Sequence, residues 1–309
     1  MCPSIPPIKI TDMKGEFCRV ITSDGLELQG LFVTPEGGPS KTTLVHVHGL
    51  AGNFYENRFV DYAADACTGA GINFFTFNNR GHDYISDLIS QAPDGTAGYR
   101  QIGGSLEIFE DCIKDIQAWI DFLKARGTER LILEGHSHGA VKATYYLSRV
   151  ADPAIKGLVL LSPSDDFGLQ RYRMGKRFDE IVGIAQKMVA EGRGGEFMSR
   201  DYFPYVVSAA TYFDTFRPES HLKVFNISMT DTHTFPEIES VRLPVLAIVG
   251  TVEEAYIGRP DDFLTDLKRR FKNTKDFTGH FIKEAPHNYL GHEAELGQHL
   301  QEWLRAHKP

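Results

Sequence analysis

Alternating apolar and polar residues divide the chain into strands and helices. Two alternating runs within residues 16–34 flank Asp24-Gly25, a pair typical of hairpin turns, so the chain is expected to begin with two antiparallel strands. Residues 105–126 carry an apolar residue at every third or fourth position, which predicts a long amphipathic helix. Residues 84–104 are rich in glycine and are predicted to form a loop.

Short apolar runs alternate with helical segments from residue 42 onward. Such alternation is typical of a mostly parallel sheet with helices on both faces and right-handed crossovers. The predicted strands are 42–47, 72–77, 131–133, 156–162, 243–250 and 279–283, and the further predicted helices are 55–70, 140–150, 260–271 and 292–306.

The alternation stops between residues 166 and 242, where the sequence is more aromatic and less regular. We therefore expect residues 1–165 and 243–309 to form one core domain, with 166–242 inserted as a cap. The aromatic side chains of the cap either form its own core or line a pocket. A basic run either faces solvent or meets an acidic group of a substrate; its members are Arg171, Arg173, Lys176 and Arg177.

Composition narrows the possible partners. The 309 residues are 42% hydrophobic and 24% charged, as in ordinary globular proteins. A net charge of −8 argues against nucleic acid or an anionic membrane as partner and leaves small molecules or proteins.

The N-terminus lacks the features of a signal peptide, and no apolar run reaches the roughly 18 residues that a membrane span needs. Together with four scattered cysteines, this predicts a cytoplasmic protein.

One short motif suggests chemistry. Gly135-His136-Ser137-His138-Gly139 follows an apolar run and precedes a helical segment. A serine flanked in this way between strand and helix is typical of a nucleophile elbow, which lifts the Oγ atom clear of the sheet. The two glycines are expected because side chains there would collide with the returning helix. Taken alone, the motif also fits an ordinary turn with an incidental serine. Whether Ser137 is a nucleophile therefore depends on finding a base and an acid elsewhere in the chain.

A serine nucleophile needs an imidazole base, which a carboxylate in turn orients. In the doubly wound version of this arrangement, the chain order is serine, acid, histidine. Glu253 and Glu254 follow the predicted strand 243–250, and His287 follows the last strand. Both groups therefore come just after the carboxyl ends of strands, where open α/β sheets bind ligands.

These motifs resemble those of the α/β-hydrolase superfamily, in its serine esterase type with an inserted helical cap, over nearly the whole chain from about residue 15. The resemblance implies a doubly wound, mostly parallel sheet of about eight strands. It also implies Ser137 as nucleophile, His287 as base and Glu253 as acid. His48-Gly49-Leu50 would be the oxyanion loop, with the backbone N–H groups of Leu50 and His138 forming the oxyanion hole.

Several alternatives stay open. His292 is a second candidate for the base, and Glu254 for the acid. Some members of the superfamily place the acid after the sixth strand, where this chain has Asp165 and Asp166; these residues alternatively cap the first cap helix. His138 either packs within the elbow or projects toward the pocket.

The implied activity is hydrolysis of small or medium carboxylic esters without a cofactor or metal, as in capped bacterial-type esterases, of which the feruloyl esterases are one branch. The same site also suits amide, peptide, thioester, lactone or C–C bond hydrolysis, or acyl transfer. A catalytically silent hydrolase-fold binding protein is the remaining alternative. The oligomeric state is not predicted.

Overall fold

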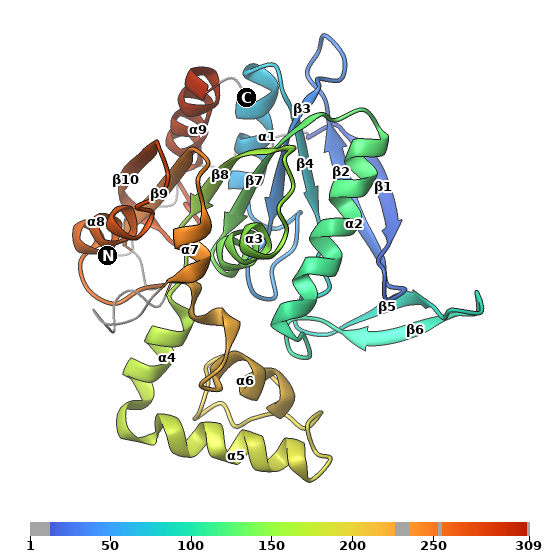
Figure 1. Cartoon of the computed structure of the whole chain (residues 1–309), viewed down its shortest axis with the longest axis vertical. Helices are drawn as coiled ribbons and strands as arrows, with labels where there is room; N and C mark the ends of the chain where they lie inside the picture. The colour runs from blue at the N-terminus through green and yellow to red at the C-terminus, as the bar shows by residue number, and fades with distance from the viewer. Residues whose placement is uncertain (1–12, 226–234, 253–254, 308–309) are drawn as a thin grey trace.

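An eight-stranded sheet forms the centre of the molecule in the computed structural model, which describes residues 13–225, 235–252 and 255–307 (Figure 1). The strand order is β1-β2-β4-β3-β7-β8-β9-β10. The pairs β1–β2 and β2–β4 are antiparallel, and all other neighbours are parallel. This confirms the predicted fold class. The strands are β1 (Glu16–Ile21), β2 (Glu27–Val33), β3 (Thr42–Val47), β4 (Asn73–Phe77), β7 (Arg130–His136), β8 (Ile155–Leu161), β9 (Val245–Val252) and β10 (Phe277–Pro286).

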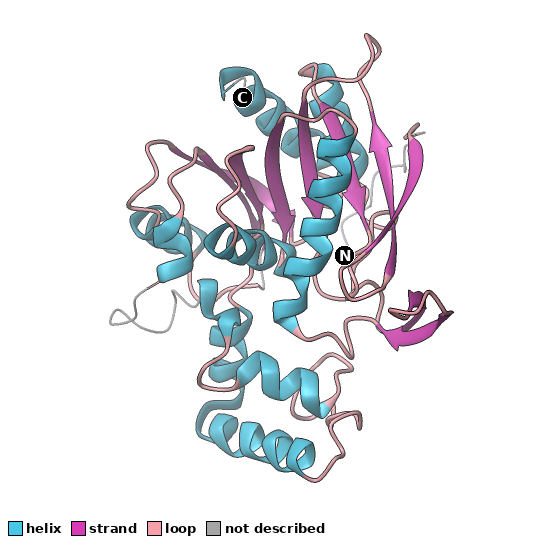
Figure 2. Ribbon diagram, turned by 45° about the vertical axis from the view of Figure 1, so that its right-hand side comes forward, coloured by secondary structure: helices cyan, strands magenta, loops and turns pink. Residues whose placement is uncertain are grey.

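Helices cover both faces of the sheet (Figure 2). One face packs against α2 (Cys112–Ala125), α3 (His138–Arg149) and α8 (Pro260–Arg270), and the other against α1 (Phe59–Gly69) and α9 (Glu293–His307). No helix in the described ranges is long and apolar enough to cross a membrane.

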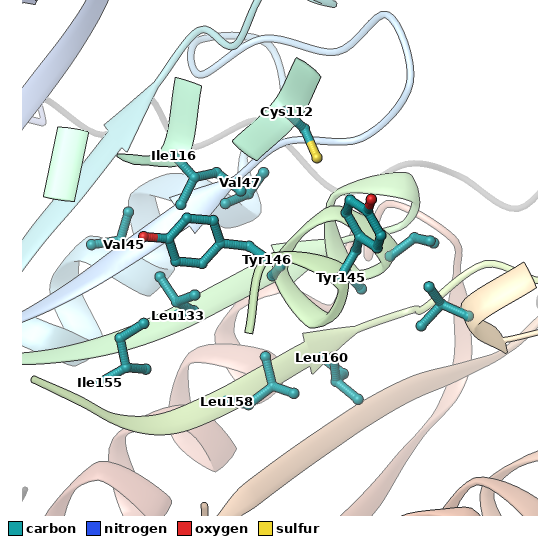
Figure 3. Packing of buried hydrophobic residues seen from close by; sticks show 14 of the residues in the cluster. Val45, Val47, Cys112, Ile116, Leu133, Tyr145, Tyr146, Ile155, Leu158 and Leu160 are labelled. Atoms are coloured by element: carbon teal, nitrogen blue, oxygen red, sulfur yellow. The ribbon is translucent and has the colours of Figure 1, made fainter. Parts of the chain in front are cut away.

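The central strands are apolar on both sides because both faces of the sheet are covered. Successive side chains of a strand point to opposite faces, so Val45 and Val47 join one core cluster while Leu44 joins the other. Figure 3 shows Val45 and Leu133 beside Tyr146 of α3 in the first of these clusters. Apolar runs without alternation, as in residues 131–133, are the sequence signature of such strands.

The prediction of a loop at 84–104 is wrong. This segment contains an antiparallel hairpin of β5 (Ser86–Gln91) and β6 (Ala97–Ile102), which forms a separate two-stranded sheet. Its turn contains Gly95 at φ +86°, a conformation that suits glycine. The helix predicted from residue 105 begins only at Cys112, after a short 3₁₀ turn, η1 (Phe109–Asp111).

The segment between β8 and β9 builds a hydrophobic cluster of its own. Its helices are α4 (Asp166–Met174), η2 (Gly175–Arg177), α5 (Phe178–Ala190) and α6 (Ala209–Phe216), which lie together at the lower end of Figure 1. The cluster runs from Phe167 to Phe216. In contrast, η3 (His221–Phe225) and α7 (Pro236–Ser240) contribute side chains to the core cluster around α3.

A buried arginine ties the β1–β2 turn to α2. The Arg80 side chain is 1% exposed and donates to Asp115 Oδ1 from Nη2 at 2.8 Å and to Asp24 Oδ2 from Nη1 at 2.9 Å. Asp111 Oδ2 lies 3.0 Å from the same Nη1 atom. Burial opposes the charge of Arg80, but Asp115 and Asp24 outweigh it and raise its pKa. Arg80 is thus part of the scaffold beneath the strand ends.

Candidate active site

Ser137 lies in a strained turn between β7 and α3, at φ 57° and ψ −126°. A non-glycine residue in such a region costs about 1–3 kcal/mol and persists only where the surroundings enforce it. A Cβ atom at Gly135 would lie 2.3 Å from the oxygen of Gly139, at the start of the returning helix, as expected from the sequence. At Gly139 the expected reason is wrong, because the obstacle is the oxygen of Val47 in β3, 2.0 Å away.

The loop after β3 packs directly against the serine. A Cβ atom at Gly49 would lie 3.0 Å from Cβ and 3.5 Å from Oγ of Ser137, so a side chain there would crowd the serine and one of the two would have to shift slightly. Buried His48 holds the loop: its Nε2 accepts from the N–H of Asn79 at 3.0 Å, and its Nδ1–H therefore donates to the oxygen of Gly49 at 2.8 Å. Burial lowers the pKa of His48 well below its ordinary value, which keeps this ring neutral.

His287 shares a cavity with Ser137. Both line a space of about 240 Å³ between the strand ends and the segment that follows β8. The backbone oxygen of His287 accepts from Nε2–H of His136 at 2.9 Å, and the two rings lie 4.9 Å apart. Burial lowers the pKa of His136 well below its usual range, so a neutral ring anchors the loop. His136 therefore holds the backbone of the His287 loop in place. His292, just before α9, is not among the described residues that line this cavity.

The candidate acids Glu253 and Glu254 lie outside the described residues. The described part of β9 ends at Val252, which pairs with Pro286, the residue before His287. The chain therefore leaves β9 beside the strand that leads to the candidate base.

Asp166, the alternative acid, is engaged by another histidine. Its Oδ2 atom lies 2.8 Å from Nδ1 of His138 and accepts from the Ser164 hydroxyl at 2.8 Å. Burial alone would raise the pKa of Asp166, but His138, Ser164 and the charge of His287 together lower it. Asp165 caps α4, accepting from the N–H of Gly168 at 2.9 Å, as one of the two alternatives for this pair expected.

The His138 side chain faces a second, smaller cavity of about 30 Å³, which Leu50, Phe109 and Asp166 also line. Phe109 meets the imidazole edge-on, with ring centroids 5.5 Å apart. The ring is therefore fixed by Asp166 on one side and by an aromatic contact on the other. His138 therefore packs at the elbow, and the cavity that it borders is not the one that Ser137 and His287 line.

A buried ion pair, linked through Asn79 to the loop after β3, was not predicted from the sequence. Lys142 of α3 is fully buried, and its Nζ donates to Glu107 Oε1 at 2.6 Å and to Asn79 Oδ1 at 3.2 Å. Asn79 in turn binds His48, so the network links α3 to the strand ends at β3 and β4. A lysine on the buried face of a predicted helix was the only available signal. In the described ranges no cluster of three or more His, Cys, Asp or Glu side chains is suited to a metal ion.

A protein-family model described as the alpha/beta hydrolase fold matches residues 42–203, which is more than half of the chain. The chain belongs to the alpha/beta hydrolase fold family. The match covers this alpha/beta hydrolase from β3 through the elbow to the residues after α5. A comparison with curated proteins finds no match.

Solved structures with the same fold cover nearly the whole of this alpha/beta hydrolase. A siderophore hydrolase, EstB from Aspergillus fumigatus, is 14% identical with a TM-score of 0.68, over 96% of this chain and 98% of the other. The Pyrococcus furiosus esterase Pf2001 is 17% identical with a TM-score of 0.62, over 98% and 97%. Est1E from Butyrivibrio proteoclasticus with bound ferulic acid is 16% identical with a TM-score of 0.61, over 94% and 98%.

Proposed function

We propose that this protein is a serine hydrolase that cleaves carboxylic esters of small or medium size through an acyl-enzyme on Ser137. The observation that carries the proposal is the strained φ of Ser137 within a cavity that His287 also lines. A strained turn at a functional residue is a common device for presenting a nucleophile. Hydrolases and an esterase among the structures of the same fold are consistent with this activity.

In the proposed reaction, His287 removes the proton from Ser137 Oγ as the oxygen attacks the ester carbonyl carbon. The resulting oxyanion accepts hydrogen bonds from the backbone N–H groups of Leu50 and His138. The close contact of Gly49 with Ser137 supports this role for Leu50. His287 then protonates the leaving alcohol. Water, deprotonated by His287, attacks the acyl-enzyme, which releases the carboxylic acid and restores Ser137.

We further propose that residues 166–242 act as the cap over this site. Leu169 of α4 and Phe203 line the cavity that holds Ser137. Phe203 also packs in the hydrophobic cluster around α5 and α6, so its ring serves both as cap core and as pocket wall. We place the reaction in the cytoplasm. The buried free thiols of Cys18, Cys67 and Cys112 support a reducing compartment.

A fluorophosphonate probe tests the proposal, because it reacts with activated serine nucleophiles. The protein should hydrolyse p-nitrophenyl butyrate, and one equivalent of probe should abolish this turnover while labelling the peptide that contains Ser137. Amide and thioester analogues in the same assay separate esters from the other acyl substrates. Turnover that persists after complete labelling, or a label on another serine, would show that the nucleophile is wrong. Absence of both turnover and labelling would favour a silent binding protein.

The acid is assigned by comparing three isosteric variants. Glu253→Gln is expected to lower kcat by about 10³- to 10⁴-fold, because the imidazole of His287 would lose the carboxylate that fixes its tautomer. Glu254→Gln and Asp166→Asn should each cost about tenfold or less. The measurement is kcat for p-nitrophenyl butyrate, with the melting temperature of each variant as a check on folding. If Asp166→Asn is the most impaired of the three, the acid lies after β8 and our assignment fails.

A further inference from the structure

One face of α4 forms a wall of the cavity that holds Ser137. Asp166, Leu169, Gln170 and Arg173 all line this cavity. They are spaced at i, i+3, i+4 and i+7, which places them along a single stripe of the helix. Asp166 and Arg173 are therefore separated along the wall by about 10 Å, at a helical rise of about 1.5 Å per residue.

The two ends of this stripe carry opposite charges. Asp166, at the start of the helix, is paired with His138 and also interacts electrostatically with His287. Arg173, in the last turn, is exposed, and no hydrogen bond, ion pair or ring contact to it occurs within the described part of the chain. At one end of the wall the Asp166 carboxylate is already paired with His138. At the other end the Arg173 guanidinium has no partner among the described residues and can bind a ligand.

Two other cations of the basic run, Arg171 and Arg177, are arranged differently. Arg171 lies over the ring of Phe178 at 5.6 Å and lines another cavity. Arg177 faces Glu180 at 3.9 Å and the ring of Tyr202 at 5.7 Å. Favourable interaction with the helix C-terminus explains a cation at either position 171 or 173. It does not explain why one of them opens into the cavity of the candidate nucleophile.

Neighbouring Gln170 makes this part of the wall rigid. Its side chain is buried, and Nε2 donates to the backbone oxygen of Tyr202 and to the Tyr212 hydroxyl, the latter at 3.0 Å. These bonds fasten α4 to the rest of the cap one turn before Arg173. These contacts therefore fix the backbone of α4 from which the Arg173 side chain extends into the cavity.

We propose that Arg173 binds a carboxylate of the substrate, so that the preferred esters carry a carboxylate several bonds away from the scissile carbonyl. A planar guanidinium binds a carboxylate through two parallel hydrogen bonds. The net charge of −8 repels anions in general, so a local cation in the cavity is needed to hold one. Asp166 at the opposite end disfavours the reversed orientation. This inference rests on the proposed ester hydrolysis and specifies its substrate class.

The test compares esters of equal length with and without the carboxylate. On the acyl side the pair is mono-p-nitrophenyl suberate and p-nitrophenyl octanoate, and on the alcohol side 4-carboxyphenyl hexanoate and phenyl hexanoate. For one of the two pairs, Arg173→Gln should lower the ratio of kcat/KM values, anionic over neutral, by about tenfold or more. Because the same two esters are used for the variant and for wild type, differences in their intrinsic reactivity affect both ratios equally and cancel when the ratios are compared. Arg171→Gln, on the same helix, is the matched control and should leave both ratios within about twofold.

Two further observations sharpen the result. Arg173→Lys should retain part of the preference, because it keeps the charge but loses the paired geometry. Added salt should reduce the preference in wild type and have little effect in Arg173→Gln, since an exposed ion pair is screened. Ratios that are unchanged in Arg173→Gln for both pairs would overturn this inference while leaving ester hydrolysis intact. If wild type cleaves none of the four esters, the proposed function itself fails, and this inference with it.

Discussion

Replacing Ser137 with alanine should lower kcat for p-nitrophenyl butyrate by about 10⁴- to 10⁶-fold, the range seen when a hydrolase loses its nucleophile. Without Oγ no acyl-enzyme forms, and only the oxyanion donors and substrate binding remain to assist attack by water. The melting temperature should stay close to that of wild type, because alanine at 137 keeps the backbone and removes only the hydroxyl.

Ser164→Ala provides the matched control for this experiment. Ser164 lines the same cavity and also carries a hydroxyl, but that hydroxyl donates to Asp166. Its loss should therefore cost about tenfold or less in kcat, since a single hydrogen bond from a hydroxyl to the Asp166 carboxylate is removed and the chemistry is untouched. If Ser137→Ala keeps more activity than Ser164→Ala, the hydroxyl of Ser137 is not the nucleophile.

Arg80→Met should lower the free energy of unfolding by about 3–5 kcal/mol, the usual effect of removing one partner from a buried ion pair. The variant would leave Asp115, which is fully buried, without the guanidinium that compensates its charge. It would also release the β1–β2 turn at Asp24 from α2. Urea unfolding followed by circular dichroism measures the change.

Arg100→Met is the control, because Arg100 also contacts Asp24, at 3.2 Å, but with a side chain that is 40% exposed. Such an exposed pair is worth about 0–1 kcal/mol. Equal effects of Arg80→Met and Arg100→Met would mean that burial of Arg80 does not matter.

Interaction with Arg80 also lowers the pKa of Asp24 despite its burial. A lowered carboxylate pKa contributes stability at neutral pH that is lost only as the pH falls through the folded-state value.

The sequence was most informative about the sheet. A strand covered on both faces is mostly apolar at consecutive positions, and such a run at residues 131–133 stands out from any helical period. The β5–β6 hairpin was missed because it lies at the surface. Its outer face exposes Ile89 and Tyr99, and its inner face buries only single residues such as Leu88, so its alternation is weak.

The serine and its candidate base were visible because each lies in a short motif with a fixed relation to a strand end. The pairs that hold the site in place were not visible. Lys142 and Glu107 are 35 positions apart, and His138 and Asp166 are 28 apart. Periodicity tells which face of a helix is buried, but it does not tell which charge from another element will meet that face. Such pairings depend on how the elements pack in three dimensions.

The separate hydrophobic cluster between Phe167 and Phe216 affects how the substrate preference of such a protein can change during evolution. Its helices lie between β8 and β9 in the chain, whereas Ser137 follows β7 and His287 follows β10. Mutations inside the cluster can therefore reshape the wall of the cavity without altering the strands that carry these two residues. Under the proposed cap role, selection for a new substrate would act mainly on this one contiguous segment. Grafting it between related proteins is then a direct way to transfer substrate preference.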